Sequence, residues 1–222
     1  MMMSDVEIQD ALQKGELVIA GFDPKSLEGS SYDAHLGTQA LVSNRDNLIN
    51  VQADQSVTLQ PGEFALFITH ERFEMPPNIA AHIGMRSSLA RQGLVLLAGM
   101  QIDPTFKGHL RLGYYNASQR RIVVDYMDSI CTIEFHKLQT AARKVMPEYP
   151  ELQAGRIPSD DRAYLRQIET TSLSDLSKRL QELTTNVSSL TRDVSTLTKV
   201  TYAVIVGVGL TLLGAILNLI FK

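Results

Sequence analysis

Two arginines and two serines lie within six residues of this chain, in the run Arg86-Ser87-Ser88-Leu89-Ala90-Arg91. The guanidinium group of arginine is a rigid fork of donors that matches phosphate oxygens, and serine adds hydroxyl donors. Apolar segments with strand-like alternation flank the run on both sides. These residue types predict an anion cradle suited to phosphate, and the alternative is a surface turn with ordinary polar residues.

The overall composition limits the classes of function. The chain has 222 residues, of which 44% are hydrophobic and 20% charged, and its net charge is −3. This length suits one globular domain with an appendage. Nonspecific nucleic-acid binding needs clustered positive charge, so nucleic acid is not an expected partner.

Cysteine and histidine usage argues against a zinc centre. The single cysteine, Cys131, lies in the apolar run 129–133 and is predicted to be a buried structural thiol. The five histidines are scattered without metal-ligand spacing. His35 and His109 alternate within strand-like runs, where we expect surface or hydrogen-bonded polar residues rather than ligands.

The elements that must position the polar run begin with a helix. Ser4 and Glu7 have the spacing of a capping box, and Gly15 is a natural helix stop. Met1 to Asp5 lead directly into this polar, capped segment, so no signal peptide is predicted.

From Glu16 to His136 the chain consists of short apolar or alternating runs, separated by turn residues such as Pro61-Gly62 and Asp103-Pro104. This pattern predicts a mostly β fold, an antiparallel roll or barrel. From Lys137 to about Asp161, proline and glycine residues predict an extended arm, or alternatively a linker.

A heptad pattern follows Asp161. Its seam comprises Leu173, Leu176, Leu180, Leu183, Val187, Leu190, Val194 and Leu197. This pattern predicts a coiled-coil stalk over residues 161–199, and the alternative is one amphipathic helix packed on the head. Leucine at every d position, with valine at two a positions, favours a dimer.

The last segment, residues 200–222, is predicted to be a membrane anchor. Val200 to Phe221 carry no charge and lie between Lys199 and Lys222. At about 1.5 Å per residue, this run is long enough to cross a hydrocarbon core of about 30 Å. A buried core helix is the alternative. We expect a single-pass C-terminal anchor with the head in the cytoplasm, where one unpaired cysteine fits a reducing compartment.

Several motifs together resemble the dCTP deaminase branch of the dUTPase-like superfamily. They are Ser31-Tyr32-Asp33-Ala34-His35-Leu36-Gly37, Glu71-Arg72-Phe73-Glu74-Met75-Pro76, the Arg86–Arg91 run, Ile102-Asp103-Pro104 with Phe106 and Gly108, and Tyr115-Asn116. The resemblance covers roughly residues 4–160, and weakly includes Gln153–Ser159. It implies a dUTPase-like β-roll or distorted barrel that forms a homotrimer. A trimeric head would impose its symmetry on the stalk.

The resemblance also implies a nucleotide site. In the family, the positions of Arg86, Ser87 and Ser88 contact the triphosphate, with Mg²⁺ expected through the phosphates and no zinc. The position of Arg91 lies beside the base and the attacking water.

Three further positions complete the implied site. Asp103 matches the residue that meets the deoxyribose hydroxyl, or that activates water in the dUTPases. Phe106 lies where an aromatic ring stacks on the sugar. Gln153 matches the glutamine of a late lysine–glutamine pair, and the lysine position is Tyr149 or Glu148, depending on a one-residue gap.

One position departs from the family pattern. The catalytic glutamate, three residues before the asparagine of the last motif, is replaced by Gly113. Glycine has no side chain to carry a proton, which argues against deamination by the family mechanism. The dUTPase pattern is also incomplete, because its second aspartate is Thr105 here and its glycine-rich arm has no match.

Three hypotheses follow for a chain with a head (1–160), a stalk (161–199) and an anchor (200–222). The first is a non-catalytic nucleotide sensor whose stalk couples binding to the membrane span, as an antiviral or cell-death effector. The second is a membrane-tethered dUTP or dNTP diphosphatase that uses Asp103, with dCTP deamination as a variant. The third is a structural trimerisation module. We favour the first, because it accounts for Gly113 together with the stalk and anchor.

Overall fold

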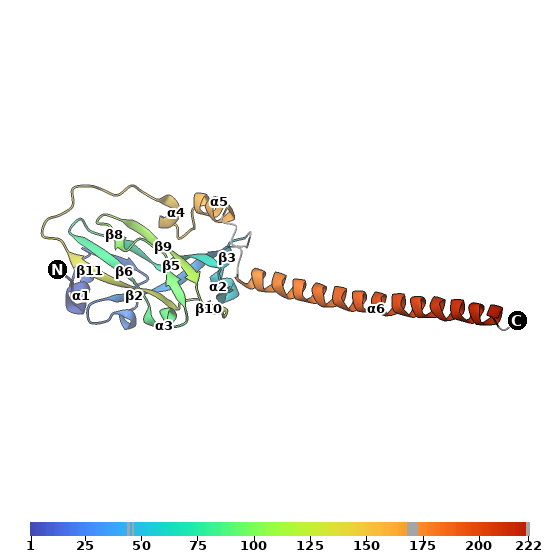
Figure 1. Ribbon diagram of the computed structural model, residues 1–222. Helices are drawn as coiled ribbons and strands as arrows, with labels where there is room; N and C mark the ends of the chain where they lie inside the picture. Colours follow the sequence, from blue (N-terminus) through green and yellow to red (C-terminus); the bar gives the residue numbers. More distant parts are fainter. Residues whose placement is uncertain (44, 46, 168–172, 221–222) are drawn as a thin grey trace. The chain divides into compact units, whose positions relative to one another are not determined.

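The computed structural model describes residues 1–43, 45, 47–167 and 173–220. The chain divides into two compact units, Met1–Ser174 and Asp175–Lys222, and each is considered by itself. The first unit contains a β-sheet with short helices, and the second consists of most of one long helix, α6 (Leu173–Ile220) (Figure 1).

The N-terminal helix α1 (Asp5–Gln13) forms as predicted. The Ser4 hydroxyl accepts a hydrogen bond from the Glu7 backbone N–H at 3.3 Å, and the Glu7 carboxylate accepts from the Ser4 N–H at 3.0 Å. This reciprocal capping box satisfies two backbone donors at the helix start. Gly15 follows the helix with φ +70°, a left-handed conformation that costs glycine little.

Strands are the main secondary structure of the first unit, which confirms the mostly β prediction. The strands are β1 (Val18–Ala20), β2 (Tyr32–Val42), β3 (Ile49–Asn50), β4 (Ser56–Leu59), β5 (Phe64–Glu74), β6 (Ile79–Met85), β7 (Leu94–Leu96), β8 (Gln101–Ile102), β9 (Lys107–Asn116), β10 (Ile122–Asp125) and β11 (Ser129–Lys137). The short helices between them are η1 (Pro24–Ser26), α2 (Val51–Asp54) and α3 (Ser87–Ala90).

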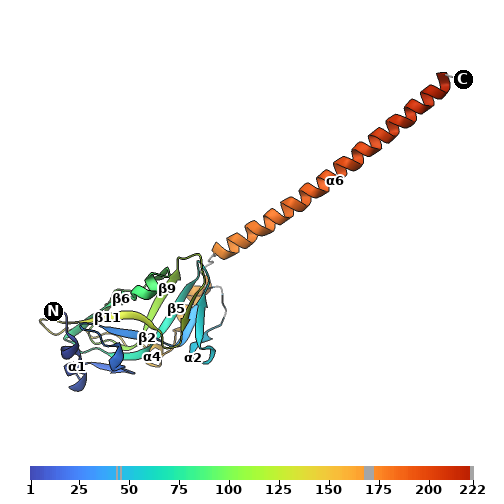
Figure 2. The ribbon, with the colours of Figure 1, turned by 90° about the horizontal axis from the view of Figure 1, so that it is seen from below.

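The described strands pair in antiparallel fashion. The main sheet runs in the order β7-β9-β5-β2-β11-β6-β8, with β1 added to β5 and β3 added to β2. Strands β4 and β10 form a separate pair. Figure 2 shows β9, β5 and β2 side by side. Because β11 pairs with both β2 and β6, residues far apart in the sequence meet on one sheet face.

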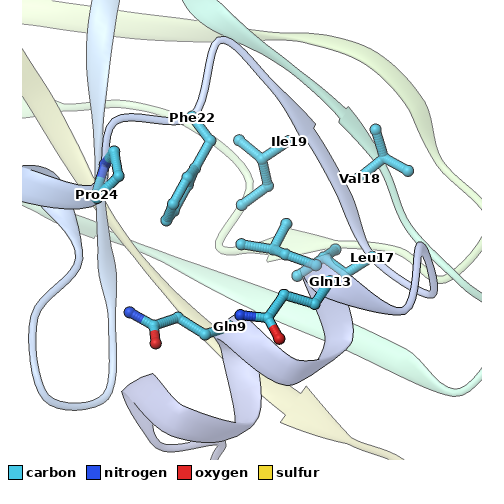
Figure 3. A pocket seen from close by; sticks show the side chains of 8 residues that line it. Gln9, Gln13, Leu17, Val18, Ile19, Phe22 and Pro24 are labelled. Carbon is cyan, nitrogen blue, oxygen red and sulfur yellow. The ribbon is translucent and has the colours of Figure 1, made fainter.

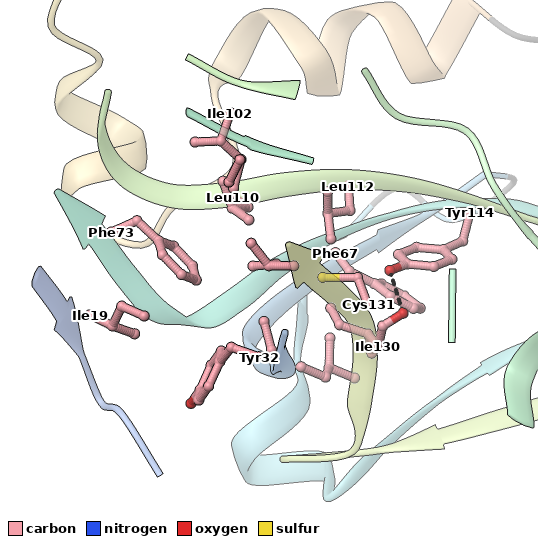
Figure 4. Packing of buried hydrophobic residues seen from close by; sticks show 14 of the residues in the cluster. Ile19, Tyr32, Phe67, Phe73, Ile102, Leu110, Leu112, Tyr114, Ile130 and Cys131 are labelled. Atoms are coloured by element: carbon pink, nitrogen blue, oxygen red, sulfur yellow. Dashed lines mark hydrogen bonds between the residues drawn. The ribbon is translucent and has the colours of Figure 1, made fainter. Parts of the chain in front are cut away.

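Aromatic side chains fill the core of this sheet (Figure 4). Tyr32, Phe67 and Tyr114 are fully buried. The Tyr114 hydroxyl donates to the Ile130 carbonyl at 2.9 Å, which satisfies its polar end. Cys131 is also fully buried, as predicted, and burial raises the pKa of its thiol.

The segment after β11 is only partly extended. Residues 138–149 form no helix or strand, but α4 (Pro150–Gln153) and α5 (Ser159–Gln167) follow. The prediction of an extended arm was therefore wrong for its second half. Helix α4 packs on β9, where Gly108 (φ +150°) lets the backbone approach: a Cβ there would lie 3.2 Å from the Leu152 Cβ. Helix α5 is tied to β9 by an ion pair of 2.5 Å between Asp161 and Arg111.

Helix α6 carries both the heptad seam and the apolar segment. Within Lys178–Thr211 it includes a window of mean hydropathy 1.4, so it is long and apolar enough to be a candidate membrane span. The predicted stalk includes residues 168–172, and the predicted anchor includes Phe221 and Lys222. These residues lie outside the described part of the chain.

Candidate functional site

The Arg86–Arg91 run forms a single helical turn after β6. Arg86 is the N-cap of α3, and Arg91 is its C-cap. Leu89 is buried and fixes the turn to the core, whereas Ser87 and Ser88 are exposed. The run therefore presents two hydroxyls and two arginines on and beside one short helical turn.

A buried aspartate orients the first of these arginines. The Arg86 Nη1 donates to Asp33 Oδ2, and the Thr132 hydroxyl donates to Asp33 Oδ1 at 2.7 Å. The Asp33 side chain is 6% exposed and that of Arg86 is 32% exposed. Arg86 Nε is buried without a hydrogen-bond partner among the described residues, so this arginine keeps an unused donor.

Sequence reasoning named Asp33 only as part of a motif and missed its contact with Arg86. The contact depends on strand register: Asp33 on β2 faces Thr132 on β11, and Thr132 faces Gly84 on β6. Gly84 lies two residues before Arg86. The early motif Ser31–Gly37 was the available signal, but it does not specify which strands pair.

Asp103 and Phe106 come together in a cavity of about 270 Å³. Both line it, together with Met146 and Tyr149 from the segment after β11. The Asp103 carboxylate is partly buried and accepts a hydrogen bond of 2.7 Å from the Gln101 side chain. A carboxylate beside an aromatic ring in a cavity can accept from a hydroxyl or orient a water.

The other predicted residues do not line this cavity within the described chain. They are Arg86, Ser87, Ser88, Arg91, Gly113 and Gln153. Gln153 is the last residue of α4 and is half-buried, although its neighbour Leu152 does line the cavity. Within one chain, the residues predicted to bind phosphate and those that line the Asp103 cavity therefore form two separate groups.

Gly113 lies where the sheet leaves no room for a side chain. It is buried in β9 opposite Leu66 of β5, and its carbonyl accepts from the Leu97 N–H at 2.7 Å. A Cβ at Gly113 would lie 2.6 Å from the Leu97 carbonyl oxygen and 2.9 Å from Phe64 Cζ. Backbone and aromatic atoms thus occupy the space that the first carbon of any side chain at Gly113 would need.

The asparagine that closes the last motif is structural. Asn116 is fully buried, and its amide donates to the carbonyls of Leu59 at 3.0 Å and Arg120 at 2.8 Å. Its side-chain oxygen accepts from the Ser118 backbone and hydroxyl. These bonds hold the end of β9 against β4 and the following turn.

The two earlier motifs meet in a buried polar network. Glu71 is fully buried and accepts from the Tyr32 hydroxyl at 3.1 Å, the His35 backbone N–H at 2.9 Å and His35 Nδ1 at 2.5 Å. The hydrogen bond to Glu71 raises the pKa of His35. His109 donates to the Thr69 carbonyl at 2.9 Å, and burial lowers its pKa. Both histidines are hydrogen-bonded polar residues, as expected.

A larger groove of about 530 Å³ lies between α1 and β1. Leu17, Ile19 and Phe22 form part of its wall, with Gln9 and Gln13 from the helix (Figure 3). Its described lining includes none of the residues predicted for the nucleotide site.

Comparison with known proteins identifies the family of this chain. Residues 2–138 match a family described as dCTP deaminase-like. A dCTP deaminase from Pyrococcus abyssi is 34% identical over 128 residues, which cover 58% of this chain and 81% of that protein. A "dCTP deaminase, dUMP-forming" from Aquifex aeolicus is 29% identical over 169 residues, which cover 72% of this chain and 94% of that protein.

A solved structure supports the same assignment at the level of fold. The crystal structure of 2'-deoxycytidine 5'-triphosphate deaminase from Agrobacterium tumefaciens has a TM-score of 0.53 at 17% identity, covering 61% of this chain and 48% of that one. The expected dUTPase-like fold of the head is confirmed. This chain belongs to the dCTP deaminase-like family.

Proposed function

We propose that this protein is a membrane-anchored receptor for a deoxynucleotide that retains the family's binding residues and lacks its deamination chemistry. The observation that carries this proposal is the closed space at Gly113, where a Cβ would lie 2.6 Å from the Leu97 carbonyl. A general acid or base must come within hydrogen-bond reach of the reacting group. Its loss typically removes about 10²–10⁴-fold in rate, whereas phosphate and sugar contacts need not weaken.

The arrangement of donors supports binding of a phosphate. Asp33 holds the Arg86 guanidinium, whose Nε has no partner in the described chain. The hydroxyls of Ser87 and Ser88 are exposed on the same turn, as is Arg91. Charged donors to phosphate oxygens make stronger hydrogen bonds than neutral ones, so we assign the triphosphate to this turn.

We propose that the sugar of the nucleotide binds in the cavity lined by Asp103 and Phe106. Because this cavity and the α3 turn form separate groups within one chain, we propose that each complete site combines residues from two copies. A homotrimer would then hold nucleotides at its subunit junctions.

The remaining parts of the proposal concern the membrane. We propose a head over residues 1–160, a coiled-coil stalk over 161–199 and an anchor over 200–222, with the head in the cytoplasm. The apolar seam of α6 supports a stalk, and the apolar segment of the same helix supports a membrane anchor. A ligand shifts the span only if it binds two states of the head with different affinity. The proposed output is membrane permeabilisation in an antiviral or cell-death response.

The decisive test uses the full chain in detergent with a panel of deoxy- and ribonucleoside triphosphates and Mg²⁺. Melting temperature and product formation are followed together. We expect stabilisation by a deoxynucleotide without deaminated or hydrolysed product. Ligand at about 100 Kd stabilises by about 2.7 kcal/mol, which raises the melting temperature by several degrees.

Matched variants make the test specific. Ser87→Ala and Arg91→Gln change exposed residues, so each should keep the ligand-free melting temperature and lose nucleotide stabilisation. Arg121→Gln, another exposed arginine, should retain that stabilisation. Turnover of a nucleotide would overturn the receptor proposal. Failure of every nucleotide to bind would overturn it in favour of a trimerisation module.

The position of Asp103 favours one second candidate, a membrane-tethered dUTP or dNTP diphosphatase. Its carboxylate faces the cavity, beside Phe106, and is oriented by Gln101. Mg²⁺ commonly binds through one or two carboxylates plus substrate phosphates, so Asp103 fits a metal that arrives with the nucleotide. This candidate predicts pyrophosphate release that Asp103→Asn abolishes while nucleotide stabilisation survives. Absence of pyrophosphate in the wild-type reaction would exclude it.

A further inference from the structure

Three potential metal ligands meet on the outer face of β6 and β11. In the antiparallel register, His82 lies directly opposite Glu134, and His136 follows two residues later on the same face. Their ligand atoms all lie within 4.8 Å of one another. The sequence showed no metal-ligand spacing because the two histidines come from different strands.

The geometry within this cluster is close to that of a coordination site. His136 Nε2 lies 3.9 Å from Glu134 Oε2, and the ring centroids of His82 and His136 are 4.6 Å apart. Ligands about 2.0–2.2 Å from a zinc ion are about 3.3–3.6 Å apart in a tetrahedron. The His82 side chain is exposed and that of Glu134 is 45% exposed, so both can close this small gap.

One atom of the cluster lacks a partner. His136 Nε2 is buried and accepts or donates no hydrogen bond among the described residues. A buried polar nitrogen without a partner destabilises the folded state. A cation shared with Glu134 would satisfy this nitrogen.

The scaffold beneath the cluster is rigid. Ile133 and Phe135 alternate with the two β11 ligands and are fully buried, and Ala81 is buried beside His82. Strand β11 is paired on both sides, by β2 and by β6. Ligands on paired strands are positioned more accurately than ligands on loops.

We infer that His82, Glu134 and His136 bind a divalent transition-metal ion. Two imidazoles and one carboxylate suit Zn²⁺ with an open fourth position, and imidazole also suits Ni²⁺ and Cu²⁺. Mg²⁺ prefers an octahedron of oxygens, so this site is distinct in chemistry from Mg²⁺ carried by nucleotide phosphates. None of the three residues is among those that line the Asp103 cavity. The bound metal would cross-link β6 to β11 and stabilise the sheet.

The test uses the untagged full chain in detergent, stripped of metal with a chelator and then titrated with Zn²⁺ in competition with a chromogenic chelator. We expect one Zn²⁺ per chain, a higher melting temperature with Zn²⁺, and no such effect of Mg²⁺. His82→Gln and Glu134→Gln should each weaken Zn²⁺ binding by at least about tenfold, since loss of an outer-shell partner alone typically costs 10–100-fold.

A matched control separates this site from nonspecific histidine binding. His70 is one of the chain's five histidines and lies on β5, outside the cluster. His70→Gln should therefore leave Zn²⁺ affinity unchanged. The metal-free melting temperatures of the His82 and Glu134 variants report whether they fold. Absence of saturable Zn²⁺ binding, or equal binding by folded wild type and both cluster variants, would overturn the inference. Neither result depends on whether a nucleotide binds.

Discussion

At the residue scale, Gly113 is constrained by packing as well as by chemistry. A Cβ there would meet the Leu97 carbonyl oxygen at 2.6 Å, and a backbone atom cannot move aside like the end of a flexible side chain. We therefore expect Gly113→Ala to destabilise the head by about 1–3 kcal/mol, the usual cost of overpacking a core. Thermal unfolding of the full chain, followed by circular dichroism, measures this loss.

A second strand glycine provides the control. A Cβ at Gly84 of β6 would meet only the Thr132 carbonyl, at 3.7 Å, which is ordinary contact. Gly84→Ala should therefore change stability by no more than about 0.5 kcal/mol. Equal melting temperatures for the Gly113 and Gly84 variants would show that the space at Gly113 is not closed. For the same steric reason, Gly113→Glu should not create deaminase activity.

At the element scale, β2 and β5 are tied by the pair between His35 and Glu71. The hydrogen bond to Glu71 raises the pKa of His35 above 6.5, and the nearby charges of Asp23 and Asp33 act in the same direction. The folded state therefore binds more protons than the unfolded state above about pH 6.5. The stabilisation is fully present below that pH and is lost as the pH rises through the folded-state pKa of His35.

The measurement is the melting temperature of the full chain across about pH 5 to 8, where histidine titrates, with an extension to higher pH. Above about pH 6.5, wild type should become less stable as the pH rises. His35→Gln should have a lower melting temperature at every pH and should lose the fall with pH that His35 causes. His70→Gln should retain that fall. An unchanged slope in His35→Gln would assign the pH dependence to other groups.

The same elements show what the sequence could predict. The capping box at Ser4, the short strands and buried Cys131 follow from local patterns, and all are confirmed. The contact of Asp33 with Arg86 and the cluster around His82 depend on which strands pair, which local patterns do not specify.

Helices α4 and α5 were missed for a related reason. Proline and glycine between residues 137 and 161 indicated an extended chain. Pro150, however, occupies the first turn of α4, where proline is well tolerated. Gly155 (φ +64°) follows the end of the same helix. Pro150 and Gly155 therefore mark the two ends of a short helix rather than an extended chain.

At the scale of the whole molecule, the second unit by itself leaves an apolar seam exposed. The described seam residues, each 58–66% exposed, are Leu180, Leu183, Val187, Leu190, Val194 and Leu197. Many flanking hydroxyls bond to their own helix, as Thr184 does to the Leu180 carbonyl at 2.8 Å and Thr191 to the Val187 carbonyl at 2.8 Å. Association of this helix should therefore depend on the apolar seam rather than on polar flanks.

Leu190→Asp tests this directly, because it places a charge at a d position of the seam. Burial of one leucine side chain contributes about 1.5–3 kcal/mol per chain, and a charge would also have to be desolvated. We expect the variant to lose stalk-dependent assembly, measured by light scattering of the full chain in detergent. Ser189→Asp, the adjacent position off the seam, is the matched control and should assemble as wild type does.

The wild-type mass decides between the two oligomers that the sequence allows. Valine at two a positions favours two strands, whereas the resemblance of the head implies three. A three-chain mass would mean that the head sets the symmetry and that the stalk adopts it. A two-chain mass would contradict the proposed trimeric receptor. If Leu190→Asp and wild type have the same mass and the same melting temperature, the seam does not hold copies together, and the coupling of nucleotide binding to the membrane through a stalk fails with it.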